Sequence, residues 1–567
     1  MRSFKMSINK ILRIALANIP LQNKLSQGLG ASKIFSQILI NRGLNSVDEA
    51  EKFLKAGLEN LLDPHSFSDM GKAISLIKKA RKNKERVMIF GDYDVDGITA
   101  LSLLKNTLFK MGLDVTHYLP HRIKEGYGLN KNILHIAKQK DMKLLITVDC
   151  GTNSHEQIKE LRRHNIDVIV TDHHESSSAE PLLASAVINP KLKDSGYQYR
   201  DLAGVGVAYK LCQAITSKDL FEELDLVSLG TIADVVPLTG ENRIIVREGL
   251  LRLSGTSRPG LKALIKNSGI RAKKITPEFV SYILGPRINA SGRMDTADIS
   301  LNLLMSEEDS QAEELASIVE THNRQRQKIE SKILEEAQDL INREINFKEN
   351  KIIVIAKENW HQGVLGIVAS KLADRFYRPT ILISKTSELC KGSGRSIKNF
   401  NLFQALLECK DCLETFGGHS HATGLVIAKD NIEDFKNRIN RLAKERLQIE
   451  DLLPSWDIDM ELGISDLNEA LVAELEGLQP FGTGNPEPLF YARNLKLKSE
   501  PQVLSRDTIK FWVTDGKNTH QAIGFGMGSL KESLGQADCF DLVYTLKLDS
   551  WYGEENVLLE IKDIFFR

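Results

Sequence analysis

Short apolar runs alternate with segments of helical spacing in the part of the chain that starts at Arg86. Three of these runs, RVMIFG, KLLITV and DVIVT, are rich in Val, Ile and Leu, and an aspartate follows each of them: Asp92, Asp149 and Asp172. Strands that alternate with helices are typical of βαβ units, which form parallel sheets. Because open α/β sheets bind ligands beyond the carboxyl ends of their strands, the pattern predicts a parallel sheet with a carboxylate-rich edge.

The length of 567 residues is too great for one hydrophobic core and predicts three or four folded units. Residues 306–345 contain no Gly or Pro, which predicts one long helix. A second α/β pattern starts with KIIVIA (351–356), and alternating strand patterns after Trp456 fit a small β-barrel. We therefore expect an α/β protein with five parts: a helical segment (1–80), a parallel-sheet domain (81–300), a connecting long helix (301–348), a second α/β domain (349–452) and a β-barrel domain (456–567).

The composition, with 42% hydrophobic and 26% charged residues, is that of a soluble globular protein. No apolar run approaches the roughly 18 residues that cross a bilayer, and the N-terminus lacks the pattern of a signal peptide. Six scattered cysteines, among them the CxxC of Cys409 and Cys412, do not form a disulfide framework. These features predict a cytoplasmic protein without membrane attachment.

The segment DYDVDG (92–97) places three carboxylates two residues apart, and these repel one another unless a cation or protons compensate their charge. EF-hand calcium loops also begin with D-x-D-x-D-G. They require a glutamate at the twelfth position, which here is Leu103, and a strand pattern rather than a helix precedes the loop. The sequence therefore argues against an EF-hand.

Further carboxylates and imidazoles follow the other predicted strands: Asp149 in VDCG, His173 and His174 in TDHH, and Asp234 in ADVVP. Taken singly, such residues are more often helix caps, turn residues or surface histidines. As a set at one sheet edge, mixed carboxylates and imidazoles suit Mn²⁺, and Mg²⁺ less well. Four to six such ligands predict two metal ions, the arrangement that supports in-line displacement at phosphorus.

The motifs DYDVDG, VDCG, TDHHE and ADVVPL, in this order, resemble those of the DHH phosphoesterase superfamily. The stretches GVLGIVASKLA, GSGRS and FGGHSHATG resemble the DHH-associated substrate-binding domain. GPRINASGR (285–293) and PFGTGNPEPLF (480–490) are similar to sequences of the bacterial RecJ family. The resemblance implies a DHH domain, a DHH-associated domain and an oligonucleotide-binding (OB) fold in the last part of the chain.

The resemblance also implies roles for individual residues. His174 would be a neighbouring ligand or an acid, and Asp92 a direct ligand or an orienting residue. Asp172 would be structural and fix an adjacent imidazole, and His419 would lie near the scissile phosphate. The implied chemistry is hydrolysis of a phosphodiester with two Mn²⁺ or Mg²⁺ ions. The implied metal ligands are Asp94, Asp96, Asp149, His173 and Asp234.

Arginines in glycine-rich segments are candidates for phosphate binding, because a guanidinium group pairs with phosphate through two hydrogen bonds. Arg122 lies in a glycine-flanked loop, and Arg395 and Ser396 end the GSGRS stretch, whose backbone N–H groups could cradle a phosphate. Solvated charges and flexible turns are the alternative explanation. The other candidate DNA-binding residues are Arg287, Asn289 and Arg293, expected in a loop bracketed by Pro and Gly, and His361.

The resemblance implies an exonuclease that degrades single-stranded DNA from 5′ to 3′, releases mononucleotides and acts in recombination and repair. One alternative is an oligoribonuclease, cyclic-dinucleotide phosphodiesterase or pyrophosphatase of the same superfamily; another is a catalytically inactive DNA-binding scaffold. The long helix and the β-barrel argue against the former, and the intact carboxylates and histidines against the latter. The expected partners are single-stranded DNA, a single-strand-binding protein and a RecQ-like helicase, and the expected state is a monomer.

The net charge is zero but unevenly distributed: from Trp456 onward the chain has 10 Lys and Arg against 19 Asp and Glu, a balance of −9. This argues against a basic groove over the whole β-barrel domain. Either its basic residues cluster on one face, or the domain closes a channel or docks partners. Its aromatic residues could stack on bases, although strand alternation predicts that at least half are core. The residues concerned are Arg493, Lys496, Lys498, Arg506 and Lys510, and Phe511, Trp512, Phe525, Trp551 and Tyr552.

Overall fold

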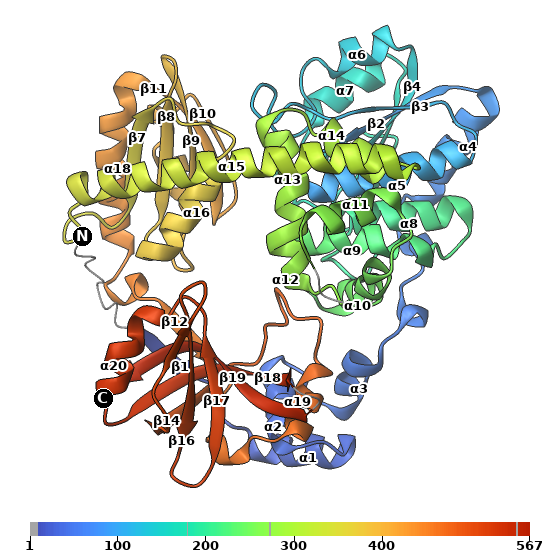
Figure 1. Cartoon of the computed structure of the whole chain (residues 1–567). Coiled ribbons are helices and arrows are strands. Elements are labelled where there is room, and N and C mark those ends of the chain that lie inside the picture. Colours follow the sequence, from blue (N-terminus) through green and yellow to red (C-terminus); the bar gives the residue numbers. More distant parts are fainter. Residues whose placement is uncertain (1–9, 179, 271–273, 552–553) are drawn as a thin grey trace. The chain divides into compact units, whose positions relative to one another are not determined.

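The computed structural model describes residues 10–178, 180–270, 274–551 and 554–567 (Figure 1). These residues form two compact units. The first consists of residues 63–234 and 249–454, and the second of residues 10–62, 235–248 and 455–567. The second unit therefore combines segments that lie far apart in the sequence.

A five-stranded parallel sheet in the order β3-β2-β4-β5-β6 forms the centre of one domain of the first unit. Its central strands are buried almost throughout, as expected for a parallel sheet covered by helices. This confirms the predicted parallel α/β domain. The elements are α4 (Met70–Asn83), β2 (Arg86–Gly91), α5 (Val95–Lys110), β3 (Val115–Tyr118), α6 (Ile133–Gln139), β4 (Met142–Val148), α7 (His155–Arg163), β5 (Asp167–Thr171) and β6 (Ala186–Ile188).

A series of helices follows this sheet, and it includes the segment for which a loop was expected. Arg287, Asn289 and Arg293 lie in helix α13, so the loop prediction was wrong. Pro286 occupies the first turn of α13, where the missing N–H is not needed, and proline there favours a helix start. The helices are α8 (Gly204–Thr216), α9 (Leu224–Ala233), α10 (Gly240–Ser254), α11 (Pro259–Asn267), α12 (Pro277–Phe279), α13 (Gly285–Met294) and α14 (Asp298–Leu304).

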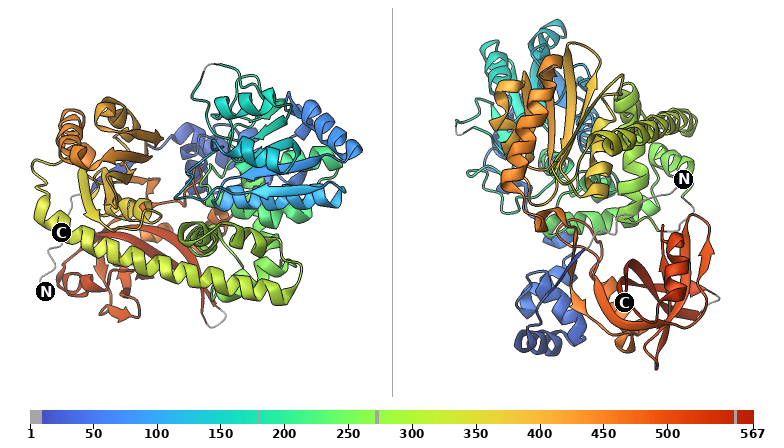
Figure 2. Two further views of the ribbon diagram at one scale, coloured as in Figure 1. Left: turned by 90° about the horizontal axis from the view of Figure 1, so that it is seen from above. Right: turned by 90° about the vertical axis from the view of Figure 1, so that its left-hand side faces the viewer.

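Helix α15 (Asp309–Glu344), with 36 residues, connects the two α/β domains of the first unit (Figure 2). It packs against α11, α13 and α14 toward its start and against α16 and β7 toward its end. Its buried residues recur at helical spacing, as in Ala312, Ala316 and Val319. The predicted long helix is confirmed. In the part of the chain that the structure describes, no helix combines the length and apolar character needed to span a bilayer.

The second α/β domain is built on a five-stranded mixed sheet in the order β10-β11-β9-β8-β7. Helices α17 and α18 pack on one face through a shared apolar core. Helices α15 and α16 pack on the other face, over β7 and β8. The elements are β7 (Ile353–Glu358), α16 (Leu365–Phe376), β8 (Thr380–Lys385), β9 (Leu389–Arg395), α17 (Leu402–Glu408), β10 (Thr415–Gly418), β11 (Ala422–Ala428) and α18 (Ile432–Arg446).

A β-barrel forms most of the second unit. Strand β14 pairs with both β18 and β16, which closes the circuit β14-β18-β19-β17-β16. A closed five-stranded barrel is the architecture of an OB-fold, as predicted. The elements are β12 (Ser455–Ile458), β13 (Met460–Glu461), α19 (Glu469–Glu476), β14 (Phe490–Leu497), β15 (Gln502–Leu504), β16 (Thr508–Thr514), β17 (Thr519–Gly524), α20 (Lys531–Gln536), β18 (Phe540–Trp551) and β19 (Glu554–Phe566).

Of the predicted N-terminal helical segment (1–80), residues 10–62 belong to the unit of the barrel and share its core, which the sequence did not indicate, whereas α4 belongs to the first unit. Strand β1 (Ile11–Ile14) pairs in parallel with β12. Helices α1 (Ile19–Leu29), α2 (Lys33–Asn41) and α3 (Val47–Lys55) share one hydrophobic cluster with the barrel strands. Arg42 and Asp459 form an ion pair of 2.8 Å across this boundary. The two segments therefore stabilise each other.

The Leu39→Ala substitution in α2 is expected to lower the free energy of unfolding of the second unit by about 2–5 kcal/mol, because Leu39 is fully buried and its truncation leaves a cavity. Hydrogen exchange of amides in β14 and β18 measures this loss. Leu16→Ala is the control, since Leu16 is 92% exposed, and it should stay within about 0.5 kcal/mol of wild type. Unchanged protection of β14 and β18 in a folded Leu39→Ala chain would show that α2 does not belong to the barrel's core.

Candidate metal centre and nucleic-acid cleft

The carboxyl ends of β2, β4 and β5 lie at the same level of the parallel sheet, because Val148 pairs with Gly91 on one side and with Thr171 on the other. The next residue of each strand therefore emerges at one edge. These residues are Asp92, Asp149 and Asp172. Asp149 has a left-handed backbone (φ 60°), which aspartate tolerates better than most residues and which turns the chain sharply at the strand end.

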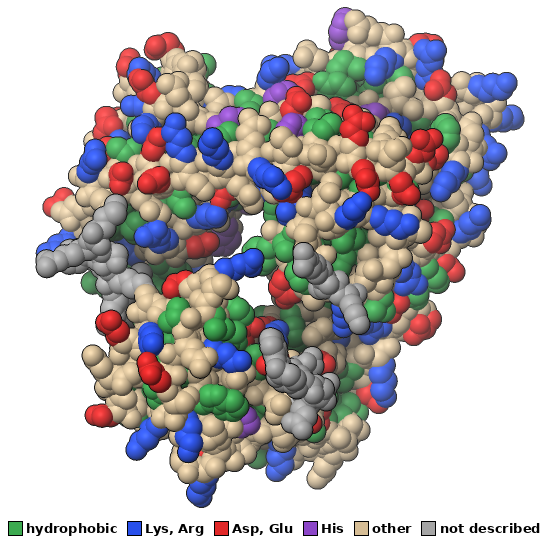
Figure 3. All heavy atoms as spheres, viewed as in Figure 1, with side chains coloured by type: hydrophobic (Ala, Val, Ile, Leu, Met, Phe, Trp, Pro, Cys, Tyr) green, Lys and Arg blue, Asp and Glu red, His purple; other side chains and the backbone are tan. Residues whose placement is uncertain are grey.

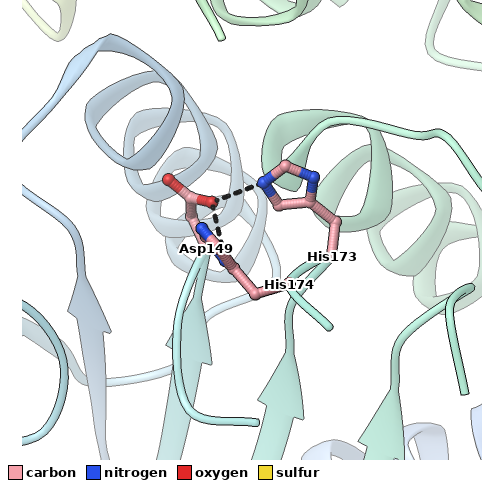
Figure 4. A group of neighbouring side chains, drawn as sticks. All are labelled: Asp149, His173 and His174. Carbon is pink, nitrogen blue, oxygen red and sulfur yellow. Dashed lines mark ion pairs between the residues drawn. The ribbon is translucent and has the colours of Figure 1, made fainter. Parts of the chain in front are cut away.

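His173 lies at the centre of the cluster of acidic side chains. Its Nε2 atom is 3.2 Å from Asp149 Oδ1, 3.5 Å from Asp234 Oδ2 and 3.8 Å from Asp96 Oδ2. Figure 4 shows the Asp149 carboxylate connected to both His173 and His174, the latter through Nδ1 at 4.0 Å. Three overlapping groups have potential ligand atoms within 4.8 Å of one another: Asp149, His173 and His174; Asp96, His173 and Asp234; Asp92, Asp94 and Asp149.

Asp94 and Asp96 come from the start of α5. Asp94 caps this helix and accepts a hydrogen bond from the Gly97 N–H at 3.1 Å. Both oxygens of Asp96 accept hydrogen bonds from the N-terminus of α8, from Gly204 N–H (2.6 Å) and Val205 N–H (2.7 Å). Each Asp96 oxygen keeps one lone pair for a further partner.

Gly204 allows the N-terminus of α8 to approach the cluster closely. A Cβ at this position would lie 2.6 Å from Asp149 Oδ1, so any other residue would displace that carboxylate. Asp234 enters the cluster from another direction, because it follows α9 directly. Three strand ends and three helix ends therefore fix the positions of the candidate ligands.

The cluster requires compensating positive charge. Burial raises the pKa of Asp92 to about 8 and that of Asp96 to about 7, and the Asp94 carboxylate adds to both shifts. Burial and neighbouring carboxylates also raise the pKa values of Asp149 and Asp234 well above the usual range. At neutral pH these groups cannot all be ionised unless cations balance them.

The donor set fits divalent cations. Asp92 and Asp149 each have a buried carboxylate oxygen without a hydrogen-bond partner, and neither ring nitrogen of His173 has one. Burial lowers the pKa of His173 to about 3, so the imidazole is neutral and has a lone pair to donate. Carboxylates combined with a neutral imidazole suit Mn²⁺.

Asp172 orients His174. Its Oδ1 lies 2.8 Å from His174 Nδ1 and also accepts the His173 N–H at 2.7 Å, and its Oδ2 accepts the Thr152 N–H at 2.9 Å. Burial opposes ionisation of Asp172, but the hydrogen bonds with His174 and Thr152 and the positive charge of the two imidazoles together outweigh it, so that the pKa of Asp172 lies below its usual range. The negative charge of Asp172 favours a proton on His174 Nδ1, so Nε2, which lies 3.5 Å from the Tyr127 hydroxyl, is the nitrogen that can act in the cleft.

The acidic cluster opens into a cavity of about 900 Å³ between the two α/β domains of the first unit. One side of the cavity is lined by residues of the acidic cluster: Asp92, Asp94, Asp149, His174 and Asp234. His419, in the second domain, lines the other, and its ring lies parallel to that of His174 at a centroid distance of 6.4 Å. The cavity thus holds the candidate ligands from one domain and the Gly-Gly-His segment from the other.

Three arginines line the same cavity: Arg122, Arg293 and Arg395. The Arg122 guanidinium lies 4.0 Å from the centre of the Tyr93 ring. Burial lowers the pKa of Arg293 well below its usual range, and the positive charges of the other two arginines contribute to the shift. Several half-buried guanidinium groups that line one cavity favour binding of an anion there. On the face shown in Figure 3, acidic and basic side chains are otherwise interspersed.

The structure does not bring four of the predicted DNA-binding residues into the lining of the cavity: Arg287, Asn289, Ser396 and His361. Arg287 is paired with Glu320 of α15 at 2.8 Å. In a helix each residue is rotated by about 100° from the last, so Arg287 points away from Arg293, whereas Asn289, four residues before Arg293, lies on the same side of α13. His361 lies beside the cavity, which its neighbours Gln362 and Gly363 line.

Ser393, and not the predicted Ser396, is the serine of this stretch that lines the cavity. Ser393 and Arg395 lie two residues apart in β9 and therefore share the face that lines the cavity. Ser396 follows the strand, and its hydroxyl donates to the Phe400 carbonyl at 2.6 Å. Strand alternation could have identified Ser393 if the GSGRS stretch had been recognised as a strand and not as a turn.

Sequence reasoning also missed Tyr127 and Lys391. Tyr127 lines the cavity, and its hydroxyl lies 3.0 Å from His174 Nδ1. Lys391 Nζ donates to the Ile123 carbonyl at 2.7 Å and so connects the second domain to the loop that follows β3. The Tyr127 ring stands in a loop without periodicity, so no local pattern in the sequence marked it as part of the cleft.

The β-barrel has its own groove of about 720 Å³, lined by residues that include Lys510, Trp512, His520 and Gln521. Trp512 is 44% exposed and Phe525 is also exposed, whereas Phe511 is buried in the core. Acidic residues such as Glu469 and Asp549 line the same groove, so it is not strongly basic. The side chain of Trp551 and the whole of Tyr552 lie outside the described residues.

Comparison with known protein families assigns each domain. Residues 86–231 match the N-terminal domain of the DHH family, residues 349–445 the DHHA1 domain, and residues 458–563 the RecJ OB domain. The chain is 38% identical to the single-stranded-DNA-specific exonuclease RecJ of Bacillus subtilis, over 95% of this chain and 69% of that protein. It is 32% identical to the RecJ of Dickeya dadantii, over 94% of this chain and 96% of that protein.

Solved structures show the same similarity. Thermus thermophilus RecJ in complex with Mn²⁺ is similar with a TM-score of 0.84 and 26% identity, over 98% of this chain and 80% of that one. A manganese-bound exonuclease RecJ is similar with a TM-score of 0.60 and 32% identity, over 68% of this chain and 96% of that one.

The fold and the acidic cluster together define a phosphoesterase of the DHH class. Within that class, the chain belongs to the RecJ family of single-stranded-DNA-specific exonucleases.

Proposed function

We propose that this chain hydrolyses single-stranded DNA from the 5′ end, releases mononucleotides and uses two Mn²⁺ or Mg²⁺ ions. The observation that carries the proposal is the presence of the acidic cluster and the three arginines in one cavity. The names of the relatives support DNA as the substrate. The manganese and magnesium complexes of Thermus thermophilus RecJ support these metals.

We propose that Asp92, Asp94, Asp96, Asp149, His173 and Asp234 hold the two cations, with His174 as a further ligand or an acid. When bound, such cations polarise the phosphoryl group and neutralise the charge that develops on it. Asp172 holds the proton on His174 Nδ1, so His174 Nε2 faces the substrate in one tautomer. His419 approaches the same place from the second domain.

The arginines provide a basis for selecting a 5′ end. A terminal phosphate carries roughly −1.5 to −2 charges at neutral pH, whereas a diester carries one. Arg122, Arg293 and Arg395, with the Ser393 hydroxyl beside them, would bind the more highly charged group in preference. A terminal phosphate held there would present the adjoining diester to the acidic cluster in the same cavity.

Digestion of one oligonucleotide labelled at either end tests the proposal. With Mn²⁺, the 5′-labelled strand should release labelled mononucleotide at once, while the 3′-labelled strand should shorten gradually. Chelation of the metal with EDTA should abolish both reactions. Early release of mononucleotide from the 3′ label would reverse the polarity, and unchanged activity after chelation would exclude the two-metal assignment.

The alternatives account for less of the structure. An oligoribonuclease or a cyclic-dinucleotide phosphodiesterase has small substrates, which do not require the closed β-barrel. An inactive scaffold would not need an acidic cluster with unpartnered carboxylate oxygens. The single-strand-binding protein, the RecQ-like helicase, the monomeric state, the role in recombination and repair and the cytoplasmic location stay predictions from the sequence.

A further inference from the structure

Tyr127 has a hydroxyl that is hydrogen-bonded within the protein and a ring that is partly exposed. The hydroxyl donates to the Asp149 carbonyl at 3.2 Å and lies 3.0 Å from His174 Nδ1. The side chain as a whole is 51% exposed, and it lines the cavity that holds the acidic cluster and the arginines. The polar end of Tyr127 is therefore satisfied by the protein, while a face of the ring stays open to a ligand.

The loop that contains Tyr127 is anchored on both sides. The Glu125 carboxylate accepts hydrogen bonds from the Tyr118 hydroxyl (2.6 Å), the His121 N–H (2.7 Å) and the Asn130 side chain (2.7 Å). Lys391 holds the Ile123 carbonyl from the second domain. Because loop and hydroxyl are already fixed, a ligand that contacts the ring would not have to order it first.

The same cavity provides space for a flat group. Gly417 and Gly424 pair across β10 and β11 and are exposed in the cavity. A Cβ at either position would meet nothing within 4 Å, and neither has the left-handed backbone that favours glycine. By contrast Gly418 has a φ of 125°, and a Cβ there would collide with Ala422, so the fold itself explains that glycine. The fold would therefore accept larger residues at Gly417 and Gly424, and the two glycines leave open space in the cavity.

We propose that the Tyr127 ring is the surface on which a nucleobase next to the hydrolysed linkage stacks, an inference that rests on the proposed function. A tyrosine ring stacks on any base, because every base has a π-face. The arginines would bind the phosphate groups, and the Tyr127 ring would contact the base of the same strand. Such a platform positions the strand without selecting its sequence.

Two substitutions separate the ring from the hydroxyl. Tyr127→Phe keeps the ring and should leave KM within about twofold of wild type, whatever it does to kcat through Asp149 and His174. Tyr127→Leu removes the ring and should raise KM about 5- to 150-fold, the range for loss of one stacked base. Tyr282→Leu is the matched control, because Tyr282 is 79% exposed in the same unit and does not line the cavity.

Substrates with one abasic residue identify the stacked base. We compare three oligonucleotides, with the abasic residue at the first, second or third position. Tyr127→Leu should bind two of them more weakly than wild type does. At the remaining position wild type and variant should have equal affinities, since the base that stacks is missing. Equilibrium binding in EDTA gives the same comparison without catalysis, so it decides the proposal even if the chain does not hydrolyse these strands.

Two results would overturn the inference. One is an equal rise of KM in Tyr127→Phe and Tyr127→Leu, which would assign the effect to the hydroxyl. The other is a Tyr127→Leu penalty that persists at every abasic position. A wild-type chain that binds the strands but cleaves none would contradict the proposed function instead, and unfolding curves of each variant show whether a loss reflects misfolding.

Discussion

Replacement of Asp149 by alanine is expected to reduce the rate of DNA hydrolysis about a thousandfold or more in the presence of Mn²⁺. Asp149 belongs to two of the three potential ligand groups, and both histidines lie within 4.0 Å of its carboxylate. Its loss would therefore weaken the binding of both cations. Affinity for a single strand should change little, because the arginines that we propose to bind phosphate remain.

Single-turnover hydrolysis, Mn²⁺ titration and strand binding measure the three parts of this prediction separately. Asp114→Ala is the control, since Asp114 lies in the same domain, is largely exposed and forms an ion pair with Arg86 at 3.4 Å. Hydrolysis by Asp149→Ala within tenfold of wild type, with Mn²⁺ supplied, would contradict the two-metal assignment.

Arg395→Ala is expected to lower kcat/KM on a 5′-phosphorylated strand by about 1.5–3 kcal/mol, roughly 10- to 150-fold, the range for a hydrogen bond to a charged group. On a strand with a 5′-hydroxyl the loss should be clearly smaller, because the terminal phosphate is absent. The structure strengthens this expectation, since Arg395 shares the cavity with Arg122 and the half-buried Arg293.

The measurement compares wild type and variant on both kinds of end. Arg375→Ala, at the end of α16 in the same domain, is the control, because Arg375 is exposed and does not line the cavity. If Arg395→Ala loses the same factor on both ends, Arg395 is an ordinary backbone contact and end recognition lies with other residues.

The α/β architecture and the placement of the acidic cluster could be predicted because both follow from local patterns. An aspartate directly after a buried strand can only emerge at the sheet edge, so Asp92 and Asp149 were found from spacing alone. Arg287 and Asn289 were misplaced because Pro and Gly suggested a loop, whereas proline in a first helical turn is equally compatible with α13. Ser396 was preferred to Ser393 because the glycines in GSGRS suggested a turn, whereas this stretch lies mostly in strand β9.

Contacts between distant segments could not be predicted, because no local sequence pattern indicates them. The pairing of β1 with β12 joins residues more than 400 positions apart, and neither strand has a pattern that specifies the other. Tyr127 reaches Asp149 and His174 only because the loop after β3 folds over the strand ends. Long-range contacts of this kind depend on the whole packing, which local periodicity does not encode.

The shared core of the second unit also has a consequence for the order of events on the ribosome. Leu39 packs in one cluster with Leu462, which is made more than 400 residues later. At about 5–20 residues per second, the apolar side of α1–α3 waits on the order of 20–85 s for the strands that cover it. The intervening residues 63–454 contain nearly all of the first unit and can fold within that interval. The nascent chain therefore completes its catalytic half while its earliest helices are still exposed, and these helices are where we expect chaperones to bind.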